Sequence, residues 1–165
     1  MELKRWSLAY MDDLVYHGNN KKIADHLRDV FPHPYTKENA RQFIELCIHS
    51  PEYRAIHRAI INDHKSVGAI SLIIGEDVHS KSAEIGYWLG EEYWRQGIAT
   101  KAVKEMCHMA FSELGLHRVY AHVFSYNTGS CMVLKKSGFE MEGVLRKSIW
   151  KNGQIYDSFM YSRTN

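Results

Sequence analysis

The stretch YWRQGIAT, residues 93–100, is the segment from which the fold of this chain can be inferred. It follows the apolar run EIGYWL and precedes a helical pattern that extends to Leu114, so it joins a strand to a helix at Gly97. The start of a helix leaves several backbone N–H groups without partners, and glycine lets a ligand approach them closely. Arg95 can add a positive charge and Thr100 a hydroxyl donor. The stretch therefore predicts an anion site, for which phosphate is the natural ligand.

The sequence does not match the patterns of the two common phosphate-binding loops. The motif G-x-x-x-x-G-K-[ST] requires a lysine after its second glycine, but Ile98 follows Gly97 in this chain. The dinucleotide motif G-x-G-x-x-G is also absent. The predicted anion site is thus neither a nucleoside-triphosphate loop nor a dinucleotide loop.

Length and composition favour one domain over residues 1–165. Charged residues make up 24%, the net charge is +2, and no apolar run is long enough to span a bilayer. The start, MELKRWSLAYMDD, lacks the apolar core of a secretory signal and is interpreted as the first strand of a cytoplasmic domain. We expect no membrane partner.

Cysteines and histidines do not form a recognisable metal motif. Cys47, Cys107 and Cys131 are widely spaced, and none of the 10 histidines shows the H-x-x-x-H spacing of a helical metal site. Basic and acidic residues are mixed along the chain, without the concentrated basic patch that binds nucleic acid. The sequence therefore predicts neither a metal site nor a nucleic-acid partner.

Hydrophobic periodicity predicts helices and strands that alternate along the chain. Thr36 can cap a helix, three strand patterns joined by short turns favour an antiparallel meander, and Asn127 can cap a short helix that Gly138 ends. The expected elements are helices over 19–28, 37–47, 98–114 and 128–136, and strands over 1–13, 53–61, 66–74, 83–89, 117–124, 138–150 and 154–162. They predict a mixed sheet flanked by helices.

Two motifs carry a resemblance to a known family: EIGYWLGEEYWRQGIATKAV and, some thirty residues later, NTGSCMVLKKSGFE. Together they resemble the acetyl-CoA signature of the GNAT superfamily of N-acetyltransferases, and more narrowly the branch of ribosomal-protein alanine and serine N-terminal acetyltransferases. The general motif is Q/R-x-x-G-x-G/A. Trp94 departs from its first position, although this branch commonly has tryptophan there. The resemblance extends over nearly the whole chain and implies an α/β (α+β) GNAT fold: a mixed, mostly antiparallel twisted sheet of about six to seven strands with about four helices.

The resemblance also implies a binding site for acetyl-CoA and no metal. The amides of the motif would hold the diphosphate, the backbone of the strand end would pair with the pantetheine arm, and the N-x-x-S residues would face the pantetheine and the sulfur. The implied residues are, in that order, Arg95, Gln96, Gly97, Ile98, Ala99 and Thr100; Trp88 and Leu89; and Asn127 and Ser130.

Acetyl transfer requires a group that accepts a proton from the amine, because an α-amino group has a pKa of about 8 and is mostly protonated near neutral pH. Glu84 is the candidate base, and the alternative is an ordinary strand carboxylate. The tyrosine that many relatives use as an acid is replaced by Leu134, so Ser130 is the candidate donor to the leaving thiolate. Cys131 has no evident base partner, which argues against covalent catalysis.

The acceptor that the resemblance favours is the α-amino group of a protein or peptide, acetylated by direct attack in a ternary complex. Polyamines or aminoglycosides are alternative acceptors, since the branch also contains such enzymes. Glu91 and Glu92 form the only adjacent acidic pair near the motif and do not decide between these classes. A third alternative is a non-catalytic sensor that binds acetyl-CoA. We expect a monomer or a homodimer.

Overall fold

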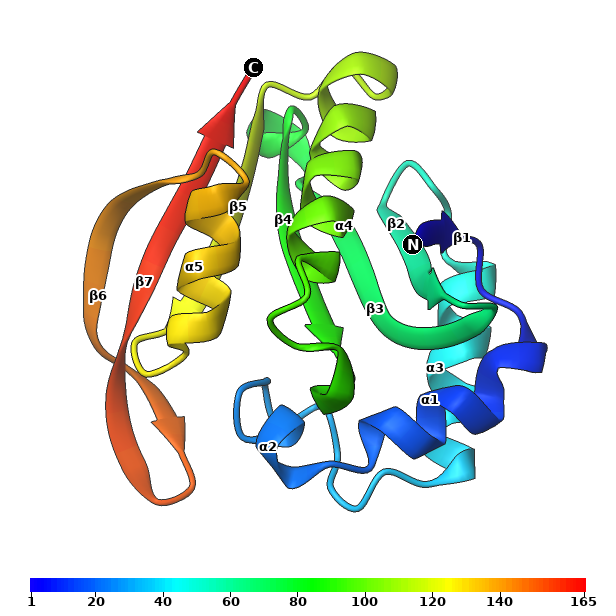
Figure 1. Ribbon diagram of the computed structural model, residues 1–165. Helices are drawn as coiled ribbons and strands as arrows, with labels where there is room; N and C mark the ends of the chain where they lie inside the picture. Colours follow the sequence, from blue (N-terminus) through cyan, green and yellow to red (C-terminus); the bar gives the residue numbers. More distant parts are fainter.

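Seven strands form one sheet in the computed structural model, which describes residues 1–165 (Figure 1). The strand order is β1-β2-β3-β4-β5-β7-β6, and every neighbouring pair is antiparallel except β4 with β5. The strands are β1 (Glu2–Lys4), β2 (Ala55–Asn62), β3 (Lys65–Ile74), β4 (Ser82–Leu89), β5 (Arg118–Phe124), β6 (Glu140–Lys151) and β7 (Gln154–Thr164). The predicted meander and the mixed, mostly antiparallel sheet are confirmed.

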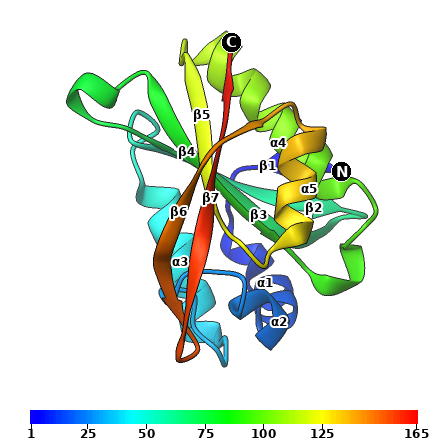
Figure 2. The ribbon, with the colours of Figure 1, turned by 90° about the vertical axis from the view of Figure 1, so that its left-hand side faces the viewer.

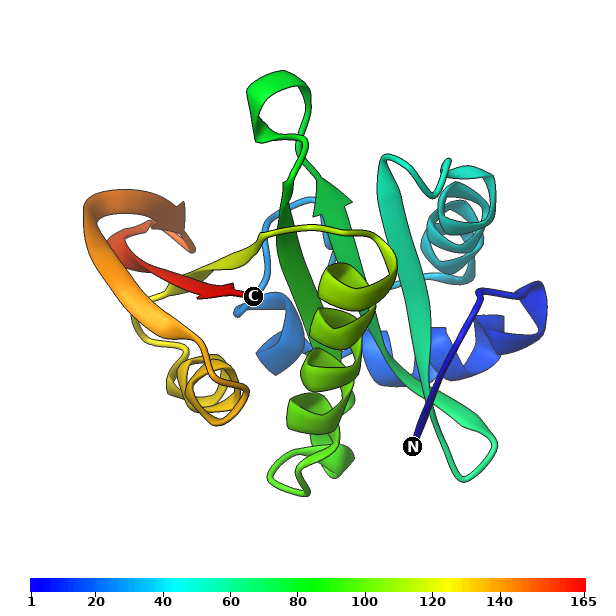
Figure 3. The ribbon, with the colours of Figure 1, turned by 90° about the horizontal axis from the view of Figure 1, so that it is seen from above.

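Helices cover both faces of the sheet. Figure 3 shows α4 and α5 on one side of the sheet and α3 on the other. The larger core lies under α4, and a second core forms where α1 and α3 pack on β2 and β3. The helices are α1 (Met11–Gly18), α2 (Lys21–Ala24), α3 (Lys37–His49), α4 (Ile98–His108) and α5 (Thr128–Lys136). None is both long and apolar enough to cross a membrane.

The first thirty residues differ most from the expectation. The predicted strand over 1–13 ends at Lys4, and the predicted helix over 19–28 is reduced to α2. The helix α1 was missed, although Met11, Leu14 and Val15 have helical spacing and two aspartates stand in its first turn. Leu14 is fully buried against α3 and the sheet, so tertiary packing stabilises this short helix.

The strands β4 and β5 are paired only at their first three residues, where Ser82 to Glu84 match Arg118 to Tyr120. Beyond this point β4 remains paired with β3 and β5 with β7, so their facing edges have no strand partner. Figure 1 shows the two strands diverging toward the ends of α4 and α5 at which these helices begin. The result is a V-shaped opening in the sheet, with the starts of two helices beside it.

Beyond β5, the hairpin of β6 and β7 curves past α5 (Figure 2). Two shifts in the register, between Met141 and Gly143 and between Leu145 and Ile149, interrupt its pairing. Such bulges strengthen the twist of a hairpin. The tip of the hairpin thereby reaches the turn after α2, where the Lys151 ammonium contacts the Leu27 carbonyl at 2.8 Å.

Candidate active site

The start of α4 has an unusual backbone. Gly97 is its N-cap with φ +79°, and Arg95 also has positive φ, at +62°. No side chain caps this helix, whereas Thr36 caps α3 and Asn127 caps α5. A Cβ added at Gly97 would meet no heavy atom within 4 Å, so the space in front of the loop is open. The predicted helix start is thus present and accessible.

Six consecutive backbone N–H groups, those of residues 95–100, have no acceptor within the protein, neither backbone nor side chain. An ordinary helix leaves four such groups unpaired, and usually a side chain satisfies one or two of them. This set lies at the positive end of the helix dipole. The structure thus brings together six of the predicted residues as a row of free donors: Arg95, Gln96, Gly97, Ile98, Ala99 and Thr100.

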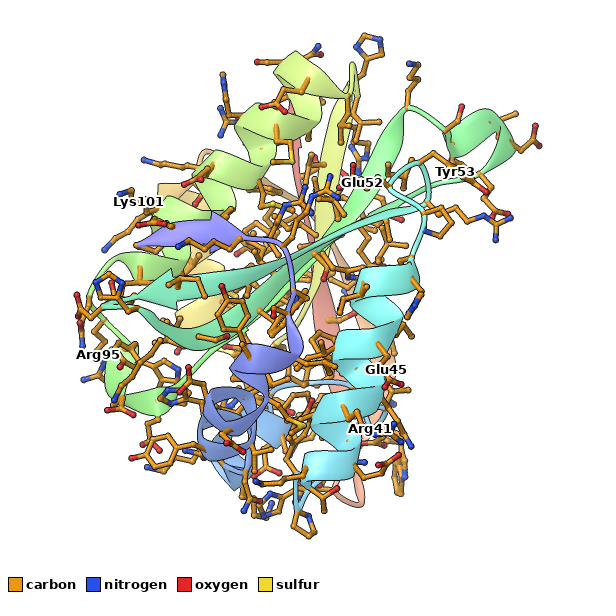
Figure 4. All side chains as sticks on the ribbon, turned by 90° about the vertical axis from the view of Figure 1, so that its right-hand side faces the viewer. Arg41, Glu45, Glu52, Tyr53, Arg95 and Lys101 are labelled. Carbon is orange, nitrogen blue, oxygen red and sulfur yellow. The ribbon has the colours of Figure 1, made fainter.

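Two cations flank this row. Figure 4 shows Arg95 and Lys101 along one edge of the molecule with their side chains directed outward, and neither forms an ion pair. The Gln96 side chain is already engaged, because its amide donates to the Glu92 carbonyl at 2.8 Å. Lys101 was not among the predicted residues, although its position one turn after Gly97 could have indicated it. Donors and charges of this kind fit a diphosphate.

The start of α5 lies on the other side of the V-shaped opening. Asn127 Oδ1 accepts the Ser130 N–H at 3.0 Å, which confirms the predicted cap and fixes the first turn. The Asn127 side-chain N–H₂ group has no partner in the protein and can donate to a ligand. Ser130 Oγ lies 2.8 Å from the hydroxyl of Tyr87, a residue that the sequence reasoning did not single out. A side-chain contact therefore joins β4, on one side of the opening, to the first turn of α5 on the other.

At the end of β4, the backbone groups of Trp88 and Leu89 point toward opposite edges of the strand. The Gly90 N–H donates to the Val67 carbonyl at 2.8 Å, and alternate residues of an antiparallel strand bond to the same neighbour. The register therefore turns the backbone of Trp88 toward β3 and that of Leu89 toward the free edge. The Leu89 carbonyl accepts the Trp94 indole N–H at 2.7 Å, which leaves the Leu89 N–H for a ligand. Of the two residues, Leu89 suits the predicted pairing, and the Trp88 ring packs against Phe31.

Glu84 lies where β4 and β5 begin to diverge. Its Oε1 is 3.4 Å from the Nδ1 of His122, and the two side chains are 32% and 38% exposed. Alternation along the strands places Gly86 on the same face as both residues, and a Cβ added at Gly86 would meet nothing within 4 Å. The carboxylate, the imidazole and the open position thus form a polar, accessible surface. His122 was not among the predicted site residues.

Positions 131 and 134 have different surroundings. Leu134 is fully buried in the larger core, so a side chain at this position is sealed from the opening. The neighbours of Cys131 include Tyr87 and Tyr161, and no histidine bonds to it. This agrees with the expectation that Cys131 is not paired with a base. No group of three or more histidine, cysteine or acidic side chains is arranged to hold a metal ion.

A short strap that we define as residues 20–29 crosses the wide end of the V. On the β4 side, Glu91 accepts from Asn20 at 2.8 Å and forms an ion pair with Lys22. The hydrogen bond from Lys22, with that from Asn20, lowers the pKa of Glu91. On the β5 side, the Tyr126 hydroxyl donates to the Asp25 carbonyl at 2.5 Å. The strap therefore links the loops at which the two arms of the opening end.

The site combines three features: a mixed sheet whose strands β4 and β5 diverge, a helix start with free backbone N–H groups on one side of the opening, and a serine in the first turn of a capped helix on the other. Together these features define the class of this protein. The chain belongs to the GNAT acetyltransferase domain family, whose model matches residues 1–140. The predicted superfamily and fold are thereby confirmed. Members of this family are acetyl-transfer enzymes that use acetyl-CoA.

Relatives of two acceptor classes are similar to this chain. The Bacillus subtilis protein YdaF, provisionally named a ribosomal N-acetyltransferase, is 35% identical over 148 residues, which cover 90% of this chain and 74% of that protein. The spermidine N(1)-acetyltransferase of Escherichia coli K12 is 30% identical over 159 residues, which cover 92% and 77%. The similarity therefore extends to enzymes named for a ribosomal and for a polyamine substrate.

A solved structure confirms the fold over almost the whole chain. The microcin C7 self-immunity acetyltransferase MccE, in complex with acetyl-CoA and AMP, has a TM-score of 0.85 at 28% identity, over 99% of this chain and 91% of that chain. Two other Bacillus subtilis relatives match with 44% and 40% identity, and there the matched segments are 46% and 51% of the relative's length. The chain thus spans about half the length of these two relatives.

Proposed function

We propose that residues 1–165 form one GNAT domain that transfers acetyl from acetyl-CoA to a primary amine, by direct attack in a ternary complex. The observation that carries the proposal is the row of six free backbone N–H groups at residues 95–100, flanked by two unpaired cations beside the V-shaped opening. Such a row suits the diphosphate of coenzyme A. Acetyl-CoA supplies an activated acetyl thioester. Residues of this chain bind the coenzyme, accept the amine proton and face the leaving sulfur.

The residues that would hold acetyl-CoA lie on both sides of the opening. Residues 95–100 would bind the diphosphate, the Leu89 N–H would pair with the pantetheine arm, and the Asn127 side chain would donate to it. Trp88 would support the end of the strand through its ring. Ser130 would face the sulfur, since its hydroxyl lies at the start of α5 beside the opening.

Glu84 is the proposed acceptor of the amine proton, with His122 as its neighbour in a proton path to solvent. A primary amine must lose a proton to attack, and an α-amino group with a pKa of about 8 carries that proton at neutral pH. The 3.4 Å separation between Glu84 Oε1 and His122 Nδ1 brings both groups to the point where the strands diverge. The partial exposure of both side chains gives the proton a path to water.

The acceptor that we favour is the α-amino group of a protein or peptide. A polyamine site needs free carboxylates, but five acidic side chains around the opening already have a cationic partner or a histidine. These pairs are Glu84 with His122, Asp25 with Lys21, Asp29 with Lys151, Glu91 with Lys22, and Glu92 with His17. Burial lowers the pKa of His17, so this histidine is uncharged at neutral pH and Glu92 keeps its negative charge. Because three of the five carboxylates are already paired with lysines, a single amine suits this surface better than a polycation.

One observation favours a polyamine acceptor, namely the 30% identity of this chain to the spermidine enzyme. The test is thiol release from acetyl-CoA with a panel of N-terminal peptides, polyamines and aminoglycosides. We expect release with peptides, and Glu84→Gln should lower kcat about 100-fold while leaving coenzyme A binding unchanged. Release with polyamines alone would refute the acceptor proposal. Tight coenzyme binding without release from any amine would favour a sensor.

A further inference from the structure

The contact between Tyr87 and Ser130 crosses the V-shaped opening. The Tyr87 hydroxyl lies 2.8 Å from Ser130 Oγ and 3.3 Å from the Ser130 carbonyl oxygen, and 43 residues separate the two in sequence. Tyr87 belongs to β4 and packs against the larger core, while Ser130 lies in the first turn of α5. No other side chain forms a hydrogen bond with the Ser130 hydroxyl.

Either hydroxyl can donate in this contact, and the direction of the bond decides where the serine proton points. Serine has one proton and two acceptor lone pairs on a hydroxyl that rotates freely unless a partner fixes it. Burial raises the pKa of Tyr87, so its hydroxyl remains protonated and can donate. When Tyr87 donates to Ser130 Oγ, the serine proton must point elsewhere. The Ser130 N–H is held by Asn127, so the serine backbone stays in place while its hydroxyl is oriented.

We propose that Tyr87 is a positioning residue that orients the Ser130 hydroxyl as a hydrogen-bond donor to the sulfur of coenzyme A. This inference rests on the proposed function. It gives Ser130 the role of donor to the sulfur, which a tyrosine has in many relatives and which the buried Leu134 cannot perform. Ser130 donates to the sulfur while the bond from the acetyl carbon to sulfur breaks and the electron pair stays on sulfur. Its proton stays on the serine oxygen, and the thiolate is afterwards protonated by water. The amine proton leaves through Glu84, so the step balances.

The first test measures the thiol of bound coenzyme A rather than turnover. The thiolate absorbs in the ultraviolet, so a pH titration of the complex yields the pKa of the bound thiol. In wild type this pKa should lie below the free value of about 8.5 because a donor stabilises the thiolate. Tyr87→Phe should raise it, so that the ratio of thiolate to thiol at a fixed pH falls about tenfold. Ser130→Ala should have the same effect.

The matched control is Tyr161→Phe, which removes a hydroxyl from another buried tyrosine. The Tyr161 hydroxyl contacts Cys131 and forms no hydrogen bond with Ser130. This variant should leave the thiol pKa unchanged. In the double variant Tyr87→Phe/Ser130→Ala, the thiol pKa and kcat should match those of Ser130→Ala alone, because Tyr87 acts through the serine. Ser130→Ala tests the same donor if the tyrosine variant fails to fold.

Two results would overturn the inference. A thiol pKa that is the same in wild type, Tyr87→Phe and Ser130→Ala would show that no donor reaches the sulfur. Additive effects of the two substitutions on kcat would show that Tyr87 does not act through Ser130. Failure of wild type to bind coenzyme A would refute the proposed function itself, and calorimetry distinguishes that outcome before any titration.

Discussion

Replacing Gly97 by alanine should weaken coenzyme A binding through the backbone alone. Gly97 has φ +79°, and the added Cβ would meet no atom within 4 Å, so no steric clash arises. An L-residue in this left-handed region costs about 1–2 kcal/mol. If the free loop relaxes to negative φ, the complex must restore the strained conformation, and Kd rises about tenfold for each 1.4 kcal/mol. We therefore expect an increase in Kd of about tenfold.

The control for this prediction is Gly115→Ala, beyond the other end of the helical stretch that begins at α4. Gly115 has φ +61°, and its nearest atom for an added Cβ is Lys81 Nζ at 4.0 Å, so the backbone cost is similar. Each variant should lower the melting temperature by about 2–4 °C per kcal/mol. Titration calorimetry distinguishes the effects of the two substitutions on affinity. It is carried out with coenzyme A and with pantetheine, which lacks the diphosphate. Only Gly97→Ala should lose affinity, and only for coenzyme A.

The reasoning would be refuted if Gly97→Ala and Gly115→Ala changed the Kd of coenzyme A equally. In that case global stability would explain the loss. It would also be refuted if Gly97→Ala weakened pantetheine as much as coenzyme A, because the free amides of residues 95–100 would then not serve the diphosphate.

Gly68→Ala should destabilise the fold by about 3 kcal/mol in urea unfolding, because its Cβ would lie 2.3 Å from the Trp88 carbonyl oxygen. Gly86→Ala, which meets no atom within 4 Å, is the matched control and should lose far less. The Arg118 guanidinium lowers the pKa of Glu142 from 4.5 to about 2, so the stability from this carboxylate is present above pH 4.5 and is lost as pH falls toward 2. Glu142→Gln should flatten this part of the acid unfolding curve, and an unchanged curve would contradict the assignment.

Local signals in the sequence were sufficient for most elements. Thr36 and Asn127 were predicted as helix caps from their side chains and are caps in the structure, because capping depends on residues within one turn. The helix over residues 128–136 was predicted with the bounds that the structure gives. The first thirty residues were predicted poorly, since α1 and α2 are short and depend on packing against distant strands.

The sequence by itself determined the family and the helix start at Gly97, and it supplied most of the residues proposed to hold the coenzyme, since these are written in contiguous motifs. Only the tertiary structure decided how that site is assembled. The pair of Glu84 with His122 joins residues 38 apart, and the pair of Tyr87 with Ser130 joins residues 43 apart. Both depend on where β4 and β5 stop pairing. That point is set by the register of the whole sheet and by the packing of helices on it, neither of which a local pattern encodes.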